Sequence, residues 1–263
     1  MRILGIESAS LTASAAIVTD DQLTAEYTIN YKKTHSQTLL PMIQEIISMT
    51  ETDLKTIDAI AVSAGPGSFT GLRIGSATAK GLALALNLPI VSVPTVDAMA
   101  YQCWRADCLI CPIMDARRNQ VYTGIYEFCQ GAFHICMEQT AMEIEYLMSR
   151  LNEMGRTVLF LGDGVPVYGE RIGQLASVKV EFAPSFLGRQ RAGAVAALGM
   201  EYFKKGICED AAIHTPIYLR PSSAERELAE KNLKKAESSL HHGQKLLSPE
   251  AEDVPGREKG HLS

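Results

Sequence analysis

The stretch AGPGSFTGLRIGSATAKGLA, residues 64–83, decides how the first half of the chain folds. It overlaps the end of a continuous apolar run over 59–64, which is typical of a strand covered on both faces of its sheet. Its glycines follow G-x-G-x-x-x-G, one residue longer than a dinucleotide fingerprint, and no P-loop pattern is present. Gly67-Ser68 also lacks the spacing of a G-x-S-x-G nucleophile elbow, so Ser68 and Thr70 are interpreted as candidates for the helix N-cap. The stretch predicts a turn followed by a helix.

Small residues recur at every fourth position of this helix, at Gly67, Gly71, Gly75, Ala79 and Ala83. A glycine inside a helix costs about 1 kcal/mol relative to alanine, so a compensating contact is expected. A stripe of small side chains allows another backbone to approach closely. We predict that it forms a helix–helix docking surface between subunits; the alternative is a well-packed internal helix.

The pattern of elements along the chain repeats. Three strands, a helix, a strand, a helix, a strand and a helix occur twice, each time over about a hundred residues. The predicted strands are 2–8, 13–19, 22–31, 59–64, 90–93, 109–115, 120–128, 132–137, 158–161 and 178–182. The predicted helices are 36–49, 70–86, 95–104, 141–154, one after the loop 162–164, and 192–205. This repetition predicts a duplicated α/β core.

We expect two lobes, residues 1–105 and 106–221, with some C-terminal segments packed on the first lobe. Residues 222–263 form a charged tail in which Glu227/Lys231 and Glu230/Lys234 are spaced for helical ion pairs, followed by a polar stretch expected to stay disordered. The paired histidines 241 and 242 are interpreted as part of this polar tail rather than as metal ligands.

Composition excludes several classes of protein. The net charge is −5 and no Lys/Arg run is present, so we expect tRNA or DNA to bind only weakly without a basic partner. No stretch reaches the ~18 apolar residues of a membrane span. The N-terminal MRILGIES lacks the features of a signal peptide, so we expect a cytoplasmic protein.

Several segments together resemble the TsaB (YeaZ) family. They are ILGIESAS, HSQTLLPMI, AVSAGPGSFTGLRIGSATAKGLA, PIMDARRNQVYTGIY and PIYLRP, which match in order and spacing over about residues 1–221. The resemblance implies the ASKHA fold, the duplicated actin- and hexokinase-like core. It also implies a non-catalytic paralogue of TsaD, the enzyme that transfers threonylcarbamoyl from its adenylate to the anticodon-adjacent adenosine of tRNAs reading ANN codons.

Members of this family bind and activate TsaD, together with the ATPase TsaE, and contact TsaD through their first two helices. The same surface forms a homodimer when TsaD is absent. By position these are the helices 36–49 and 70–86, and tRNA is expected to bind only through the complex. The residues predicted at the partner interface are His35, Leu39, Ile43, Ile46, Phe69, Gly71, Leu72, Arg73, Gly75, Ala79 and Ala83.

The chain is not expected to have its own active site. TsaD-type chemistry needs two histidines at H-x-x-x-H on a helix, and no pair here has that spacing, so no metal and no catalytic residue are predicted. A weak, degenerate nucleotide cleft is predicted at Glu7, Ser8, Ser10, Asp115, Gly162 and Gly164. No tightly bound cofactor is expected, and any ATP or ADP is expected at the interface with TsaD. The alternatives left open are an active ASKHA-type small-molecule kinase and a glycoprotease-like peptidase.

Overall fold

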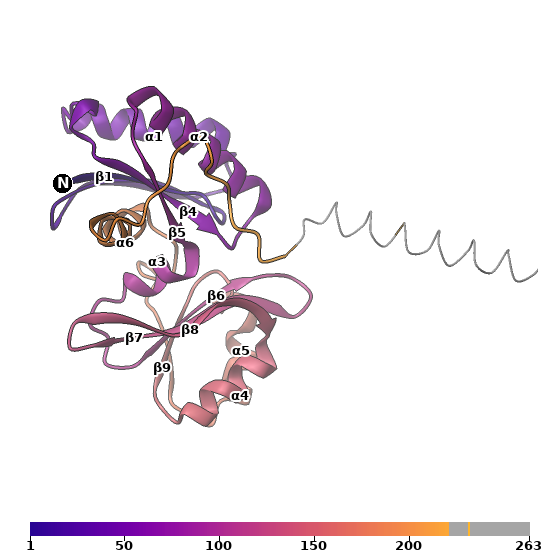
Figure 1. Cartoon of the computed structure of the whole chain (residues 1–263). Helices are drawn as coiled ribbons and strands as arrows, with labels where there is room; N and C mark the ends of the chain where they lie inside the picture. Colours follow the sequence, from indigo (N-terminus) through magenta and orange to yellow (C-terminus); the bar gives the residue numbers. More distant parts are fainter. Residues whose placement is uncertain (221–230, 232–263) are drawn as a thin grey trace, which may run out of the picture. The chain divides into compact units, whose positions relative to one another are not determined.

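The computed structural model describes residues 1–220 and Lys231 and has two five-stranded mixed sheets (Figure 1). The first sheet has the order β3-β2-β1-β4-β5, in which β1 is antiparallel to β2 and parallel to β4. Its strands are β1 (Arg2–Glu7), β2 (Thr12–Thr19), β3 (Gln22–Asn30), β4 (Ala59–Gly65) and β5 (Ile90–Pro94). Strands β1 and β4 are buried almost throughout, as their continuous apolar runs predict.

The second sheet repeats this connectivity with the order β10-β9-β6-β7-β8. Strand β6 pairs antiparallel with β7 and parallel with β9, as β1 does with β2 and β4. Its strands are β6 (Leu109–Asp115), β7 (Gln120–Cys129), β8 (Ala132–Glu143), β9 (Val158–Leu161) and β10 (Val180–Phe182). The duplicated, two-lobed α/β fold is therefore confirmed.

Helices cover both faces of the first sheet (Figure 1). On one face, α1 and α2 pack in a core with β1, β2 and β4; on the other, α6 packs on β1, β2 and β4 and also contacts α3. Helices α4 and α5 pack in the core of the second sheet. The helices are α1 (His35–Met49), α2 (Phe69–Leu86), α3 (Thr95–Tyr101), α4 (Ile144–Met154), α5 (Val165–Leu175) and α6 (Ala192–Lys204), with a 3-10 turn at Leu54–Thr56.

Helix α6 lies very close to the first sheet because glycines form part of the contact. A Cβ atom on Gly5 would overlap the carbonyl oxygen of Ala192, and one on Gly199 would overlap the Cβ of Ala61. The chain thus returns, late in the sequence, to complete the packing of its first sheet.

Residues 207–217, which we call the C-terminal strap, then cross back over the first sheet. Ile90 and Glu209 exchange two backbone hydrogen bonds of 2.9 and 2.8 Å, and the N–H of Ile217 donates to the carbonyl of Ala64 at 2.7 Å. Gly65, with φ +117°, lies where a side chain would overlap the carbonyl of Ile217, so only glycine fits this point. The strap positions the end of β4 and the start of α2.

Candidate functional site

Helix α1 buries the side that sequence reasoning assigned to a partner. Leu39, Ile43 and Ile46 follow helical spacing and lie in the core shared with α2 and β2. His35 is also buried, and its Nε2 lies 2.8 Å from the carbonyl oxygen of Ser10. The prediction that these four side chains are available to a partner is wrong, because the chain's own sheet covers them.

Helix α2 begins and ends with local signals that the sequence contains. The side chain of Ser68 accepts a hydrogen bond from the N–H of Gly71 at 3.3 Å, as the N-cap interpretation predicts. Asn87 ends the helix in the left-handed conformation with φ 56°.

The small-residue stripe of α2 faces inward. A Cβ on Gly71 would overlap the carbonyl oxygen of Ser8, and one on Gly75 would overlap the Ser8 hydroxyl, both well inside 3.0 Å. Ala79 and Ala83 are fully buried in the same core. The prediction of an intermolecular docking stripe is therefore wrong: the glycines let α2 approach the end of β1, which is the internal-helix alternative.

Nine of the eleven predicted interface residues are buried, Leu72 included, which leaves Phe69 half-buried and Arg73 exposed. The Arg73 guanidinium lies 4.4 Å from the centre of the Phe69 ring, which in turn packs against the tilted ring of Tyr218 with ring centres 4.8 Å apart. Such cation–aromatic contacts hold an exposed arginine in one orientation. Arg73 is thus the predicted contact that the structure leaves accessible at the start of α2.

The outward sides of α1 and α2 carry exposed apolar residues that sequence reasoning did not select. Leu40 and Met49 on α1 and Leu84 on α2 are 55%, 76% and 59% exposed. Between Arg73 and Asn87, the exposed residues of α2 are Ala77, Gly81, Leu84 and Ala85, so this side of the helix has almost no polar side chain. One sequence feature does indicate such exposed apolar residues: the apolar positions of both helices spread over more than one helix face. We call this set, with Arg73, the outer face of α1 and α2.

Polar side chains also meet at the carboxyl end of β1. Glu7 is fully buried, its Oε1 accepts the N–H of Ala9 at 2.6 Å, and its Oε2 has no partner. Burial raises the pKa of Glu7 to about 7. Asp163 is close enough to raise the pKa of Glu7 further, and burial also raises the pKa of Asp163. Each of these two carboxyls is therefore protonated more readily than it would be in water.

The other residues predicted for a nucleotide cleft are occupied by internal contacts. The hydroxyl of Ser8 donates to the carbonyl of Gly71 at 2.9 Å, and that of Ser10 donates to Oε1 of Gln190 at 2.9 Å. Gly162 and Gly164 pack against the carbonyl of Ile113, at the end of β6.

Of the six predicted cleft residues, Asp115 keeps part of its side chain exposed, and it pairs with Arg117 at 3.3 Å. Glu7 and Ser8 offer no surface on which a phosphate could bind, because both are fully buried. Gln190, in the segment before α6, also contacts these residues through Ser10. No sequence pattern predicts that Gln190 lies there. In the free chain, the polar residues at the carboxyl end of β1 therefore make contacts within the protein interior.

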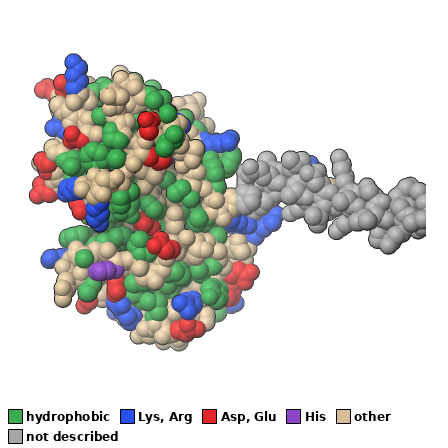
Figure 2. Space-filling view, in the orientation of Figure 1, with side chains coloured by type: hydrophobic (Ala, Val, Ile, Leu, Met, Phe, Trp, Pro, Cys, Tyr) green, Lys and Arg blue, Asp and Glu red, His purple; other side chains and the backbone are tan. Residues whose placement is uncertain are grey.

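Within residues 1–220 and Lys231, no group of three or more His, Cys, Asp or Glu side chains could hold a metal ion. The helices of the same part are too short or too polar to cross a membrane. Histidines 241 and 242 and the predicted helical tail lie outside the described residues. On the face that Figure 2 shows, basic and acidic side chains are interspersed, so no single-sign surface forms there.

Comparisons with known proteins agree with the resemblance seen in the sequence. The family model of TsaD, tRNA N6-adenosine threonylcarbamoyltransferase, matches residues 22–228. The tRNA threonylcarbamoyladenosine biosynthesis protein TsaB of Bacillus subtilis is 34% identical over 88% of this chain and 99% of its own length. The chain belongs to the TsaB family.

Two further relatives show how far this similarity extends. The TsaB protein of Escherichia coli is 34% identical over 62% of this chain and 72% of its own length. The YeaZ structure from Pseudomonas aeruginosa superposes with a TM-score of 0.70 and 25% identity, over 83% of this chain and 99% of that one. The fold and the family are thus supported independently.

Proposed function

We propose that this chain is a non-catalytic subunit that binds and activates TsaD in tRNA threonylcarbamoyladenosine synthesis. In that reaction TsaD transfers the threonylcarbamoyl group to the anticodon-adjacent adenosine of tRNAs reading ANN codons. The names of the TsaB relatives support a role in this pathway. The net charge of −5 favours binding of tRNA through the complex rather than by this chain alone.

One observation carries the proposal: α2 exposes almost no polar side chain between Arg73 and Asn87, and α1 beside it exposes Leu40 and Met49 among polar residues, although both helices already have a complete inner core. Leu40, Met49 and Leu84 are more than half exposed on neighbouring helices of a single sheet face. An exposed apolar patch bounded by polar groups is typical of a protein-binding surface. TsaD would cover this patch, and in its absence a second copy of this chain would cover it.

Activation would follow from holding TsaD in its active form. The energy available for this is the difference in affinity between its active and inactive states. TsaE is proposed as a further member of the complex, and any ATP or ADP is proposed to bind where this chain meets TsaD. The protein would work in the cytoplasm, where the tRNAs that TsaD modifies are charged and used.

The direct test is affinity for purified TsaD of the same organism, measured by calorimetry, with tRNA modification measured by mass spectrometry in the presence and absence of this chain. Leu84→Glu should weaken TsaD binding at least about tenfold, because central apolar residues dominate interfaces. Val167→Glu is the matched control, since Val167 is equally exposed on a helix of the second sheet. Unchanged affinity of the Leu84 variant, or full TsaD activity without this chain, would contradict the proposal.

A further inference from the structure

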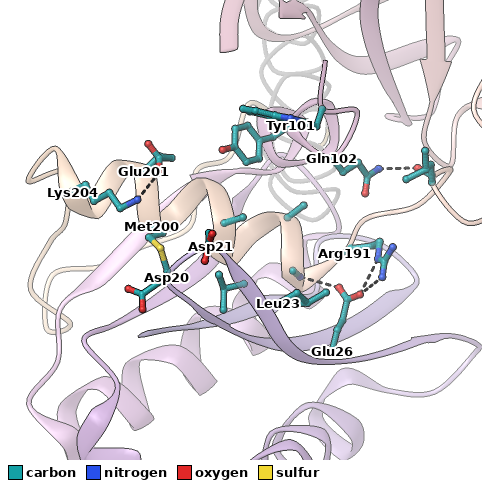
Figure 3. A pocket seen from close by; sticks show the side chains of 16 residues that line it. Asp20, Asp21, Leu23, Glu26, Tyr101, Gln102, Arg191, Met200, Glu201 and Lys204 are labelled. Atoms are coloured by element: carbon teal, nitrogen blue, oxygen red, sulfur yellow. Dashed lines mark hydrogen bonds and ion pairs between the residues drawn. The ribbon is translucent and has the colours of Figure 1, made fainter. Parts of the chain in front are cut away.

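A long groove follows α6 on the face of the first sheet opposite α1 and α2 (Figure 3). Its volume is about 670 Å³, within the range of specific binding sites. The floor of this α6 groove consists of Gly193, Ala194 and Ala197, whose short side chains leave the surface of the helix open. Because Ala197 lies about one turn after both Gly193 and Ala194, the depression runs along the helix axis.

Two large apolar side chains are among the residues that line the α6 groove. Leu23, on β3, is 47% exposed, and Trp104, just after α3, is 56% exposed. The Trp104 ring is held from behind by Tyr101 and Phe128, with ring centres 6.1 and 5.1 Å away. An exposed tryptophan with a fixed orientation is the kind of residue that dominates binding energy at protein interfaces.

The two ends of the α6 groove differ in charge (Figure 3). At the end of α6, the carboxylates of Asp20, Asp21 and Glu201 lie near Lys204. The terminal amine of Met1 binds Asp20 at 2.6 Å and Lys204 binds Glu201 at 2.9 Å, whereas Asp21 takes part in neither of these ion pairs.

At the start of α6 the exposed charge is positive. Arg191 pairs with Glu26, whose side chain is only 6% exposed, whereas that of Arg191 is 38% exposed. The dipole of α6 adds to this difference, since it is positive at the Arg191 end and negative at the Lys204 end. The groove therefore has a floor of small apolar residues, with Asp21 toward one end and Arg191 toward the other.

We propose that the α6 groove binds an amphipathic helix of a partner protein, oriented antiparallel to α6. Its apolar side would pack on Trp104 and Leu23, and the short floor residues would allow close approach of the two helices. A helix matching the 13 residues of α6 would be about 20 Å long.

Charge complementarity sets the orientation of the bound helix. Its basic end would face Asp21 and its acidic end would face Arg191, so that the dipoles of the two helices oppose each other. This surface lies on the other side of the sheet from the outer face of α1 and α2. A second protein could therefore bind at the same time as TsaD.

Peptide binding can be followed by the fluorescence of Trp104, because it is the single tryptophan of the chain. Two lactam-bridged 14-residue leucine-faced peptides without aromatic residues serve as probes. One has lysines in its first half and glutamates in its second half, and the other has these charges exchanged. The first peptide should shift Trp104 emission to shorter wavelength and bind at least about tenfold more tightly than the second at low salt.

Variants distinguish specific peptide binding in the α6 groove from nonspecific hydrophobic binding elsewhere on the protein. Ala197→Phe should fill the floor and weaken peptide binding at least about tenfold, and Asp21→Lys should remove the preference between the two peptides. Leu84→Glu should leave peptide binding unchanged, and TsaD binding by the Ala197 variant shows that it is folded. Equal binding of both peptides, no binding up to about 1 mM, or undiminished binding to the Ala197→Phe variant would overturn the proposal.

Discussion

The two halves of the chain place an acidic residue at the same point, the last position of the first strand of each sheet. Glu7 ends β1 and Asp115 ends β6, and the two strands have equivalent neighbours in their sheets. Glu7 is fully buried with one oxygen unpartnered, whereas Asp115 is partly exposed and bound by Arg117 and Tyr168. Equivalent positions of a duplicated fold have thus acquired different environments.

The helix that follows the fourth strand meets the first strand of its sheet through glycines in both halves. Helix α2 lies against the end of β1 through Gly71 and Gly75. At the start of α5, Gly162 and Gly164 likewise pack against the carbonyl of Ile113, near the end of β6. The difference lies in the acidic side chain itself: Asp115 reaches Arg117 and Tyr168 and stays partly exposed, whereas Glu7 is fully enclosed.

The largest expected effect comes from breaking this close contact. Gly71→Ala should destabilise the chain by about 2–3 kcal/mol, because the new Cβ overlaps a backbone carbonyl that cannot move aside. Chemical denaturation followed by circular dichroism measures it. Gly81→Ala is the control on the same helix, since a Cβ there meets no atom within 4 Å; equal effects of both changes would refute the close-packing explanation.

Glu7 should make stability depend on pH. Its pKa is raised by burial from 4.5 to about 7, so the folded chain holds this proton more tightly than the unfolded chain does. Stability should therefore fall as pH rises from about 4.5 to 7 and change little above that range on this account. Glu7→Gln should remove this slope and gain about 1–3 kcal/mol at pH 8 relative to the parent chain.

The matched variant for Glu7 is Asp115→Asn at the equivalent strand end. It loses a partly exposed ion pair, so its expected cost is only about 0.5 kcal/mol. Thermal unfolding across pH 4.5–8.5 distinguishes the two. A pH slope that survives in the Glu7 variant would assign the dependence to other groups.

The smallest effect concerns the glycines that make no close contact. Gly173→Ala on α5 should stabilise the chain by about 0.5–1 kcal/mol, because alanine restricts the unfolded chain and favours the helix. Urea unfolding at constant pH detects this change. Destabilisation instead would show that α5 approaches its neighbours more closely than the structure indicates.

Much of the fold could be predicted because its local signals are strong. The apolar run over 59–64 and the Ser68 cap placed β4 and α2 to within one residue. Helix α4 was predicted to begin at 141, but β8 continues to Glu143, where Met142 and Glu143 still pair with β7. The helical pattern of this segment does not show that residues 141–143 extend β8 instead of starting α4. The strand pairing depends on β7, whose residues lie some twenty positions earlier in the sequence.

The candidate site was predictable in position but not in orientation. Spacing placed Gly71, Gly75 and Ala79 on one side of α2, yet spacing does not tell whether that side meets the chain's own sheet or another molecule. The deciding contact is Ser8, more than sixty residues away in the sequence. Leu84 was overlooked because a lone exposed leucine has no periodic partner in its own helix.

Helix α6 packs on the first sheet but comes late in the sequence, which affects folding during synthesis. Residues 109–182 form the second sheet from one continuous segment, so this half has its strands together soon after they leave the ribosome. The first sheet is complete in sequence at Pro94, but α6, which covers one of its faces, ends at Lys204. That interval corresponds to roughly 5–20 s of synthesis during which the face remains uncovered. The first half of this chain therefore waits for a segment made much later to cover its sheet, whereas the strands of the second half come from one continuous segment.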